Sequence, residues 1–503
     1  MMGIKKVKDS AKDGKDKSPV TIGIIIIRII LVITLLIVAL FIVAFFDAHN
    51  LQSLYIIIIP FIIISILNYF SKSENLFPHS PNGYIFGKED GTEKRYFTEK
   101  HLLSIAPNRT GKGRGLILPN LLDNPETSVF VIDPKGENAA VSARYRQSQG
   151  HEVLIFNPYG IHAETFAARG FAQFQSFNPL ANLDPHSLNF AADVTNLAEA
   201  LVYETGGGGD SSHWVESARG LVEFLIMYLV TEPEEKETRT LRRLRSIIAG
   251  GHESILKILT LCEENKLDTV KDNVGRYVVL TPEVSSIIAT AETQTRILKH
   301  KAICAALEGG AFDFERMKHR KTSIYLILPS EYLITQARYL RLVLLVAMSQ
   351  FMHSERGRHQ VLMVLDEFAN LGTLKIIENG FGIIAGHGVT LWPFVQNLTQ
   401  LSNLYPRNWH TFFANSAAVT ASNVNDVETA NYFNSRAGRR ANENTSNLPV
   451  SKLYGANPDN LFLFLEGKTE PFELEKMQYD RDEPYKSRAD SNPMHNNTAA
   501  DDD

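Results

Sequence analysis

The sequence is poor in cysteine and carries no excess of positive charge. Its 503 residues include two cysteines, Cys262 and Cys304, which stand in different contexts and lack the spacing of metal ligands. We therefore expect both thiols to be reduced and structural. The 51 Lys and Arg residues are outnumbered by 56 Asp and Glu residues, which gives a net charge of −5. No global positive field indicates a nucleic-acid partner, so any DNA contact must be local.

Long apolar runs, by contrast, are present near the N-terminus. Residues 22–46 hold a single charge over a length that spans a bilayer core of about 30 Å and exceeds the core of a cleaved signal peptide. A second run, residues 54–70, is shorter and contains Pro60. Lysines precede the first run and follow the second at Lys72, while the connection between the runs has no Lys or Arg. By the positive-inside bias we expect a two-helix membrane anchor in residues 1–72, with the rest of the chain in the cytoplasm.

The stretch APNRTGKGRG, residues 106–115, departs from a phosphate-binding loop at both ends. In G-x-x-x-x-G-K-[ST], backbone N–H groups cradle phosphates, the lysine reaches the β- and γ-phosphates and the hydroxyl holds Mg²⁺. Here Ala106 replaces the first glycine and Gly113 the hydroxyl residue, so the motif alone fits a surface turn equally well. A strand-like run before it and a helix-like run after it favour nucleotide binding. The candidate nucleotide-binding residues are Asn108, Arg109, Thr110, Gly111, Lys112, Gly113 and Arg114.

Acidic and polar residues close three further apolar runs. SVFVIDPKGE, residues 128–137, ends in acidic and basic residues, as expected where parallel strands deliver functional groups. VLMVLDEFANLG closes in Asp366 and Glu367, which suits Mg²⁺ coordination by the first carboxylate and polarisation of a catalytic water by the second. GVTLWPFVQNL ends at Gln396, which is interpreted as a γ-phosphate sensor or, almost equally, as a polar residue that closes a strand. The loop and these runs together indicate a nucleotide site more strongly than any one of them does alone.

With these motifs the chain resembles the membrane-anchored coupling ATPases of type IV secretion and bacterial conjugation. The resemblance covers most of the chain and also rests on GGDSSHWVESARGLVEFLIMYL, FVQNLTQLSNLY and NDVETANYF. It implies ATP and Mg²⁺ as cofactors, and GKG resembles the usual loop of that family, so Gly113 is no objection to nucleotide binding. Phosphate oxygens, Asp366 and waters are then expected to hold Mg²⁺.

The resemblance also implies the fold class and the assembly. We expect an α/β, RecA-like P-loop ATPase domain (residues 73–180 and 301–485) with an all-helical insertion domain (181–300), two preceding transmembrane helices and a disordered acidic tail (486–503). The residues agree, because strand-like runs vanish between about Pro179 and His300 and return at Thr322. Residues 336–354 are expected to form a long amphipathic helix. The implied assembly is a homo-hexamer on the bacterial inner membrane.

Several local features have two interpretations. The basic clusters at residues 239–246 and 316–321 favour solvated helix faces, with a channel or substrate contact as the alternative. Trp214, after a run of glycines, is expected to be a packing residue. Arg436, Arg439 and Arg440 are candidate arginine fingers that would act across a subunit interface.

Three classes of function compete. The favoured one is an ATPase that couples a relaxase–DNA complex or protein effectors to type IV secretion channel components, with DNA itself a further candidate partner. A nucleotide-dependent recruitment scaffold is the second, although a binder needs no positioned base such as Glu367. A chromosome-type DNA pump is the third, but such pumps usually carry more spans and a winged-helix module. An ABC exporter is disfavoured because no LSGGQ-like stretch is present.

Overall fold

The computed structural model describes residues 83–203, 211–262, 274–438 and 446–494. All of them belong to the second of the two units into which the chain divides, Phe77–Asp503. The two expected membrane helices, in residues 22–46 and 54–70, lie outside the described residues. Among the described residues, no helix is both long and apolar enough to cross a bilayer.

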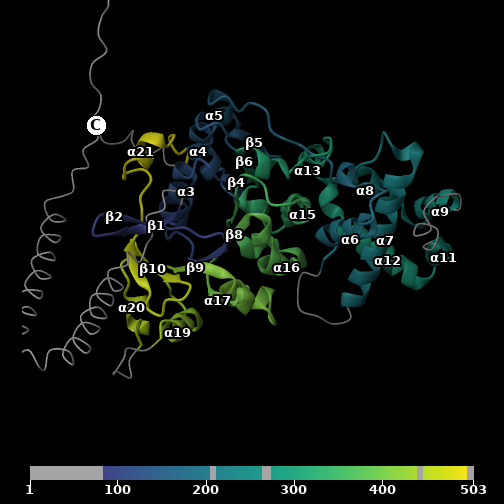
Figure 1. The fold of residues 1–503 in the computed structure, drawn as a ribbon. Helices are drawn as coiled ribbons and strands as arrows, with labels where there is room; N and C mark the ends of the chain where they lie inside the picture. The colour runs from purple at the N-terminus through teal and green to yellow at the C-terminus, as the bar shows by residue number, and fades with distance from the viewer. Residues whose placement is uncertain (1–82, 204–210, 263–273, 439–445, 495–503) are drawn as a thin grey trace, which may run out of the picture. The chain divides into compact units, whose positions relative to one another are not determined.

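The described chain contains a mixed sheet of parallel and antiparallel strands (Figure 1). Its strands follow the order β2 (Thr92–Tyr96), β1 (Tyr84–Glu89), β11 (Phe472–Glu475), β10 (Asn460–Leu465), β9 (Ser416–Ala421), β3 (His101–Ile105), β8 (Val389–Val395), β7 (Val361–Leu365), β4 (Ser128–Asp133), β6 (Thr322–Ile327) and β5 (Glu152–Phe156). Strands β9 to β5 are parallel, whereas β2, β1, β11 and β10 pair antiparallel and β10 joins β9 antiparallel. The strands that precede the candidate site, β3, β8 and β7, are direct neighbours.

The parallel strands read as continuous apolar runs because both faces of the sheet are covered. Alternate residues of β4 point into two different cores: Phe130 and Ile132 into one, Val129 and Val131 into the other. Helices α3 and α4 cover the second core, and α15 and α16 cover the first. The apolar residues that predicted each strand are therefore the residues that pack into the two cores.

The helices that accompany the sheet are α3 (Leu118–Asp123), α4 (Glu137–Ser148), α5 (Ala163–Ala168), α14 (Arg316–His319), α15 (Ala337–His353), α16 (Lys375–Ile383), α17 (Leu398–Leu404), α18 (Trp409–Ala414), α19 (Val427–Arg436), α20 (Val450–Tyr454) and α21 (Tyr485–Arg488). Helix α15 was expected to be amphipathic, but it is not. Residues 339–348 are all buried, Arg341 included, because the helix packs against α6, α16 and the core on that face of the sheet.

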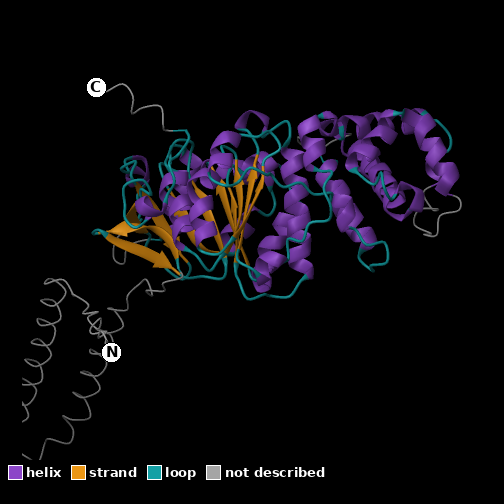
Figure 2. Cartoon of the chain, turned by 90° about the horizontal axis from the view of Figure 1, so that it is seen from above, coloured by secondary structure: helices purple, strands orange, loops and turns teal. Residues whose placement is uncertain are grey.

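Between β5 and β6, the described residues contain helices and loops but no strand (Figure 2). Besides α5 and α14, the α-helices described in this stretch are α6 (Phe190–Leu201), α7 (Ser211–Thr231), α8 (Leu241–Ala249), α9 (Gly251–Cys262), α11 (Val274–Tyr277), α12 (Pro282–Gln294) and α13 (Lys301–Ala306). Thr281 shows why α12 begins where it does: its side chain accepts a bond from Val284 N, and Pro282 fills the first helical position. Trp214 packs against the core, as expected for a packing residue.

The two basic clusters form the expected solvated faces only in part: Arg242, His319 and Arg320 are exposed, whereas Arg245 and Lys318 are buried. Arg242 pairs with Glu308, and Arg243 pairs with Glu235 at 2.6 Å. Arg245 is buried and reaches Glu292 at 2.7 Å. In the second cluster Lys318 is fully buried and donates to carbonyl oxygens in the last turn of α15 and just after it. Each cluster therefore combines exposed or half-buried cations with one buried cation that bonds within the chain.

The chain end also differs from the expectation. Residues 486–494, assigned to a disordered tail, belong to the described chain and bond to its core. Asp490 N donates to Val141 O at 3.0 Å, and Asn492 Nδ2 donates to Glu137 Oε1 at 2.9 Å. Residues 495–503 lie outside the described residues.

Candidate nucleotide site

The loop of residues 106–113 connects β3 to a helix that begins as a π-turn, Gly113–Ile117, and continues as α3. Arg109 and Gly111 take left-handed backbone angles, φ 61° and 76°, which fold the loop tightly. Gly115 N donates to Gly111 O at 2.7 Å, and the Thr110 hydroxyl donates to Pro107 O at 2.8 Å. The loop thus has the strand–loop–helix setting that a phosphate cradle requires.

Lys112 is the centre of the site. Its Nζ lies 2.9 Å from Asp366 Oδ1 and 2.7 Å from Glu367 Oε1, across more than 250 positions of sequence. Burial alone would lower the pKa of Lys112, but the two carboxylates raise that pKa above its usual value. The lysine therefore carries its charge at neutral pH, where a phosphate group would meet it.

The Asp366–Glu367 pair ends β7 in an uncommon backbone conformation. Glu367 has φ 54°, a left-handed value that costs a non-glycine residue on the order of 1 kcal/mol or more. Its N–H donates to Asp366 Oδ1 at 3.0 Å, and the short helix Phe368–Leu371 follows. This turn directs both carboxylates toward the lysine instead of one to each face, as an extended strand would do.

Gln396 bridges the loop and the acidic pair. Its Nε2 lies 3.2 Å from Glu367 Oε2 and 3.2 Å from Asn108 Oδ1, while its backbone N donates to Gln400 Oε1 at 2.8 Å. Because β3, β8 and β7 are neighbours in the parallel sheet, the residues after them meet at one edge. The structure thus brings together Asn108, Lys112, Asp366, Glu367 and Gln396.

The other predicted loop residues lie around this centre. Arg109 and Gly111 are exposed, and the Thr110 hydroxyl is bonded within the loop. A Cβ atom at Gly113 would meet nothing within 4 Å, so the glycine is not there for packing. Arg114 pairs through Nε and Nη2 with Asp480, at 2.7 and 2.8 Å.

The end of β4 has a structural role. Asp133 is buried and accepts bonds from Ala139 N at 2.8 Å and from Asn138 Nδ2 at 3.3 Å, which holds the start of α4. Burial raises the pKa of Asp133 to about 7, and nearby Asp366 adds to this shift. Lys135 is exposed and lies 3.8 Å from Glu137.

The residues fit a magnesium–nucleotide complex. Mg²⁺ in such sites takes one or two carboxylates plus phosphate oxygens and waters, and Asp366 is a carboxylate beside the loop lysine. In the described part of the chain, no cluster of three or more His, Cys, Asp and Glu side chains gathers that would suit a dedicated metal cage.

Among the candidate arginine fingers, Arg436 lies with its guanidinium carbon 5.6 Å from the Phe413 ring centroid. Arg439 and Arg440 lie outside the described residues. Sequence reasoning missed three residues near the site: Gln400, Lys476 and Asp480. No spacing signal pointed to them, because each contacts the site through the fold alone.

A lysine-bearing loop between a strand and a helix, facing an Asp-Glu pair and a glutamine from neighbouring strands, defines the class of P-loop α/β domains. The model of the type IV secretory system conjugative DNA transfer family matches residues 70–452. The chain belongs to that family, which confirms the resemblance seen in its motifs.

The chain is also similar to two curated relatives. The chain is similar to the conjugal transfer protein TraG of Escherichia coli, with 25% identity over 392 residues, 72% of this chain and 59% of the relative. It is similar to protein VirD4 of Agrobacterium fabrum, with 26% identity over 371 residues, 71% of this chain and 53% of the relative. The matched part is thus between about half and three-fifths of the length of these relatives.

Solved structures show the same fold. The bacterial conjugative coupling protein TrwBdeltaN70, in its unbound monoclinic form, aligns with a TM-score of 0.61 at 14% identity over 79% of this chain and 88% of that one. TrwB in complex with the ATP analogue ADPNP gives 0.62 at 12% identity, over 81% and 92%. The predicted α/β fold class is thereby confirmed.

Proposed function

We propose that this protein is a membrane-anchored ATPase that couples a substrate to a type IV secretion channel and helps to energise its transfer. The observation that carries the proposal is the position of the Lys112 ammonium, within 3 Å of a carboxylate oxygen of both Asp366 and Glu367. Gln396 connects this pair to the loop. Lysine, metal-binding acid, base and glutamine are the parts that phosphoryl transfer to water needs.

Each residue has a role in this proposal. The loop Asn108–Arg114 holds the phosphates of ATP, and Lys112 exchanges its two carboxylates for β- and γ-phosphate oxygens. Asp366 would hold Mg²⁺ together with phosphate oxygens and waters, and the metal would supply charge neutralisation. Glu367, released from Lys112, polarises the attacking water, and Gln396 orients that water. TrwB has been solved with ADPNP and with ADP and Mg²⁺, which supports these ligands for the shared fold.

The wider setting is part of the same proposal. Residues 1–72 anchor the chain in the bacterial inner membrane, with residues 73–485 in the cytoplasm as an ATPase domain and its helical insertion. The partners are type IV secretion channel components and a relaxase–DNA complex, effector proteins or DNA. Six copies form a ring in which an arginine of one copy, with Arg436 a candidate, completes the site of the next. The names of the relatives, a conjugal transfer protein and VirD4, support this setting.

The test is ATP hydrolysis by the purified full chain. Lys112→Ala removes the charge that meets the β- and γ-phosphates, so we expect nucleotide affinity and hydrolysis to fall to background. Lys135→Ala is the matched control, because Lys135 is exposed and follows a neighbouring strand of the same sheet. Hydrolysis by Lys112→Ala at the rate of the unmodified chain would overturn the site.

A further inference from the structure

The C-terminal segment, residues 476–494, crosses the start of the helix that follows the phosphate loop. Both carboxylate oxygens of Asp480 accept from Arg114, and Tyr479 N donates to Arg114 O at 3.3 Å. A Cβ atom at Gly115 would lie 3.0 Å from Met477 O and 3.1 Å from Lys476 Cβ. Glycine at this position therefore lets the C-terminal segment lie directly against the loop helix.

Lys476 begins the segment, and the residue is only 5% exposed. Its ammonium donates to three neutral oxygens: Thr110 O at 2.9 Å, Asn423 Oδ1 at 2.7 Å and Pro458 O at 2.7 Å. These bonds use all three donors of the group. Burial lowers the pKa of Lys476 to about 8, which leaves it mainly protonated at neutral pH. Burying a charge costs free energy, so these contacts must compensate a real penalty.

The bond from Lys476 to Thr110 O supplies a donor to a carbonyl group in the middle of the phosphate loop. In a phosphate cradle the backbone N–H groups face the ligand, so the carbonyl groups turn away and need donors of their own. Pro107 O accepts from the Thr110 hydroxyl and Gly111 O accepts from Gly115 N, both within the loop and its helix. Thr110 O, two residues before Lys112, accepts from Lys476 instead. A distant segment thus holds the middle of the loop.

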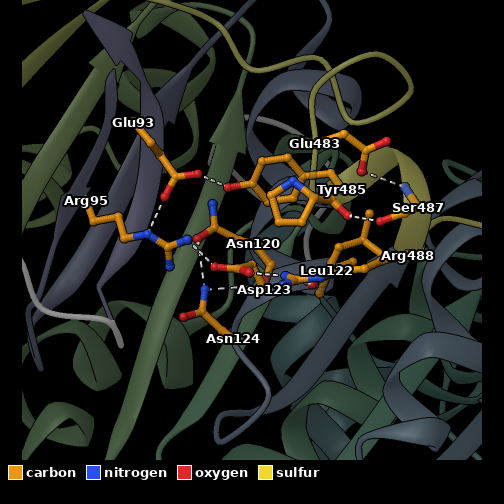
Figure 3. Close-up of polar contacts among 12 residues, drawn as sticks. Glu93, Arg95, Asn120, Leu122, Asp123, Asn124, Glu483, Tyr485, Ser487 and Arg488 are labelled. Carbon is orange, nitrogen blue, oxygen red and sulfur yellow. Dashed lines mark hydrogen bonds and ion pairs between the residues drawn. The ribbon is translucent and has the colours of Figure 1, made fainter. Parts of the chain in front are cut away.

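Two of the three acceptors that hold Lys476 lie outside the phosphate loop. Asn423 follows β9, the neighbour of β3, and Pro458 precedes β10. Farther along the C-terminal segment, Arg488 and Arg95 both bond to Asp123 at the end of α3, and the Tyr485 hydroxyl bonds to Glu93. Figure 3 shows Arg95 and Arg488 approaching Asp123 from opposite sides. Both ends of the loop helix are therefore tied to the C-terminal segment.

We propose that Lys476 is a positioning residue for nucleotide binding. It holds the Thr110 carbonyl away from the ligand and so sets the N–H groups of Asn108–Gly113 in the geometry that receives phosphate. The inference rests on the proposed nucleotide-binding function of the loop and adds to it a residue outside every motif of the sequence.

The test is the affinity of the full chain for the fluorescent nucleotide mant-ADP with Mg²⁺. Lys476→Met keeps the apolar stem but removes the donors, and we expect affinity to weaken about 10-fold or more. Lys476→Gln, which keeps an amide donor on a shorter stem, should fall between. Asn423→Gly removes one acceptor yet leaves Lys476 on Thr110, so affinity should stay within about 2-fold. The exposed Lys468→Met is a control for charge alone and should change nothing.

The possible outcomes distinguish the proposed function from the inference about Lys476. If the unmodified chain binds no nucleotide, the proposed function fails and this inference with it. If that chain binds but Lys476→Met binds equally well, the inference alone is overturned, because a merely structural lysine would lower the melting temperature without moving the affinity. Lys476→Gln decides in the same way if Lys476→Met does not fold. Weakening in the Lys476 variants but not in Asn423→Gly supports the positioning role.

Discussion

The guanidinium carbon of Arg341 lies 3.6 Å from the ring centroid of Tyr203. Arg341 is buried in α15, and Tyr203 follows the last turn of α6. The same guanidinium donates to Leu371 O at 2.7 Å and Thr373 O at 2.8 Å, in the turn that follows the Asp366–Glu367 pair. One side chain therefore joins the candidate catalytic turn to the helical stretch between β5 and β6.

We expect Arg341→Met to cost on the order of 3 kcal/mol of stability, because buried carbonyl groups lose their donors. Thermal unfolding of the full chain should show a fall in Tm of about 3 °C, since the unfolding entropy scales with the size of the folded unit. Arg358→Met, at an exposed position, is the control and should leave Tm within about 1 °C. An unchanged Tm for Arg341→Met would contradict the role of this contact.

Gln396 should affect turnover more than binding. Gln396→Ala removes the amide that connects Glu367 to Asn108, so we expect kcat for ATP to fall about 10-fold or more while KM stays within about 3-fold. Steady-state kinetics on the full chain measure both constants. Gln147→Ala, on the exposed side of α4, is the control. A rise in KM with constant kcat would instead assign Gln396 to nucleotide binding, and no change in either constant would show that it only closes its strand.

His101 predicts a pH dependence of stability. Burial lowers its pKa to about 4, whereas the unfolded chain has a value near 6.5. The unfolded state therefore takes up a proton first as the pH falls, and stability present above pH 6.5 is lost toward pH 4. The loss at pH 5 is about 2 kcal/mol.

The measurement compares chemical unfolding of the full chain with that of His101→Asn at pH 8 and pH 5. Asn keeps an acceptor for Leu391 N, which bonds to His101 Nδ1 at 3.1 Å, but does not titrate. The stability difference between the two proteins should shift by about 2 kcal/mol in favour of the variant at pH 5. An equal difference at both pH values would mean that His101 is solvated enough to titrate normally.

The paired basic cluster predicts no large role in DNA binding. Arg242 and Arg243 already face Glu308 and Glu235, so fewer counterions would be released there on contact with phosphates. We expect Arg242→Glu to leave any DNA stimulation of ATPase, and its dependence on salt, unchanged. The ATPase rate with single-stranded and duplex DNA across a salt series measures this. A salt slope reduced by about one would instead identify a phosphate contact.

The sequence could predict the elements of the site because parallel strands bury both faces. Their apolar runs mark where Asp366, Gln396 and the loop must emerge, and carboxyl ends of neighbouring strands share an edge. The order of strands that makes β3, β8 and β7 neighbours could not be read from the sequence, since strand order depends on long-range packing.

The burial of charged residues was harder to predict from the sequence. Lys318 and Arg245 read as surface cations, yet both are buried, because acceptors from distant helices surround them. Lys476 stands near the end of the chain, 366 positions from the carbonyl it holds. No periodicity encodes such contacts, since they form between groups that only the folded chain brings together.

The central claim is that Glu367 serves hydrolysis at a site that binds ATP through the loop. The most direct measurement is mant-ATP affinity and ATP hydrolysis by the full chain carrying Glu367→Gln, with the exposed Glu331→Gln as control. We predict that affinity stays within about 3-fold while hydrolysis falls at least about 100-fold, because the amide keeps the shape but cannot act as a base. Hydrolysis by Glu367→Gln at the rate of the unmodified chain would contradict the account.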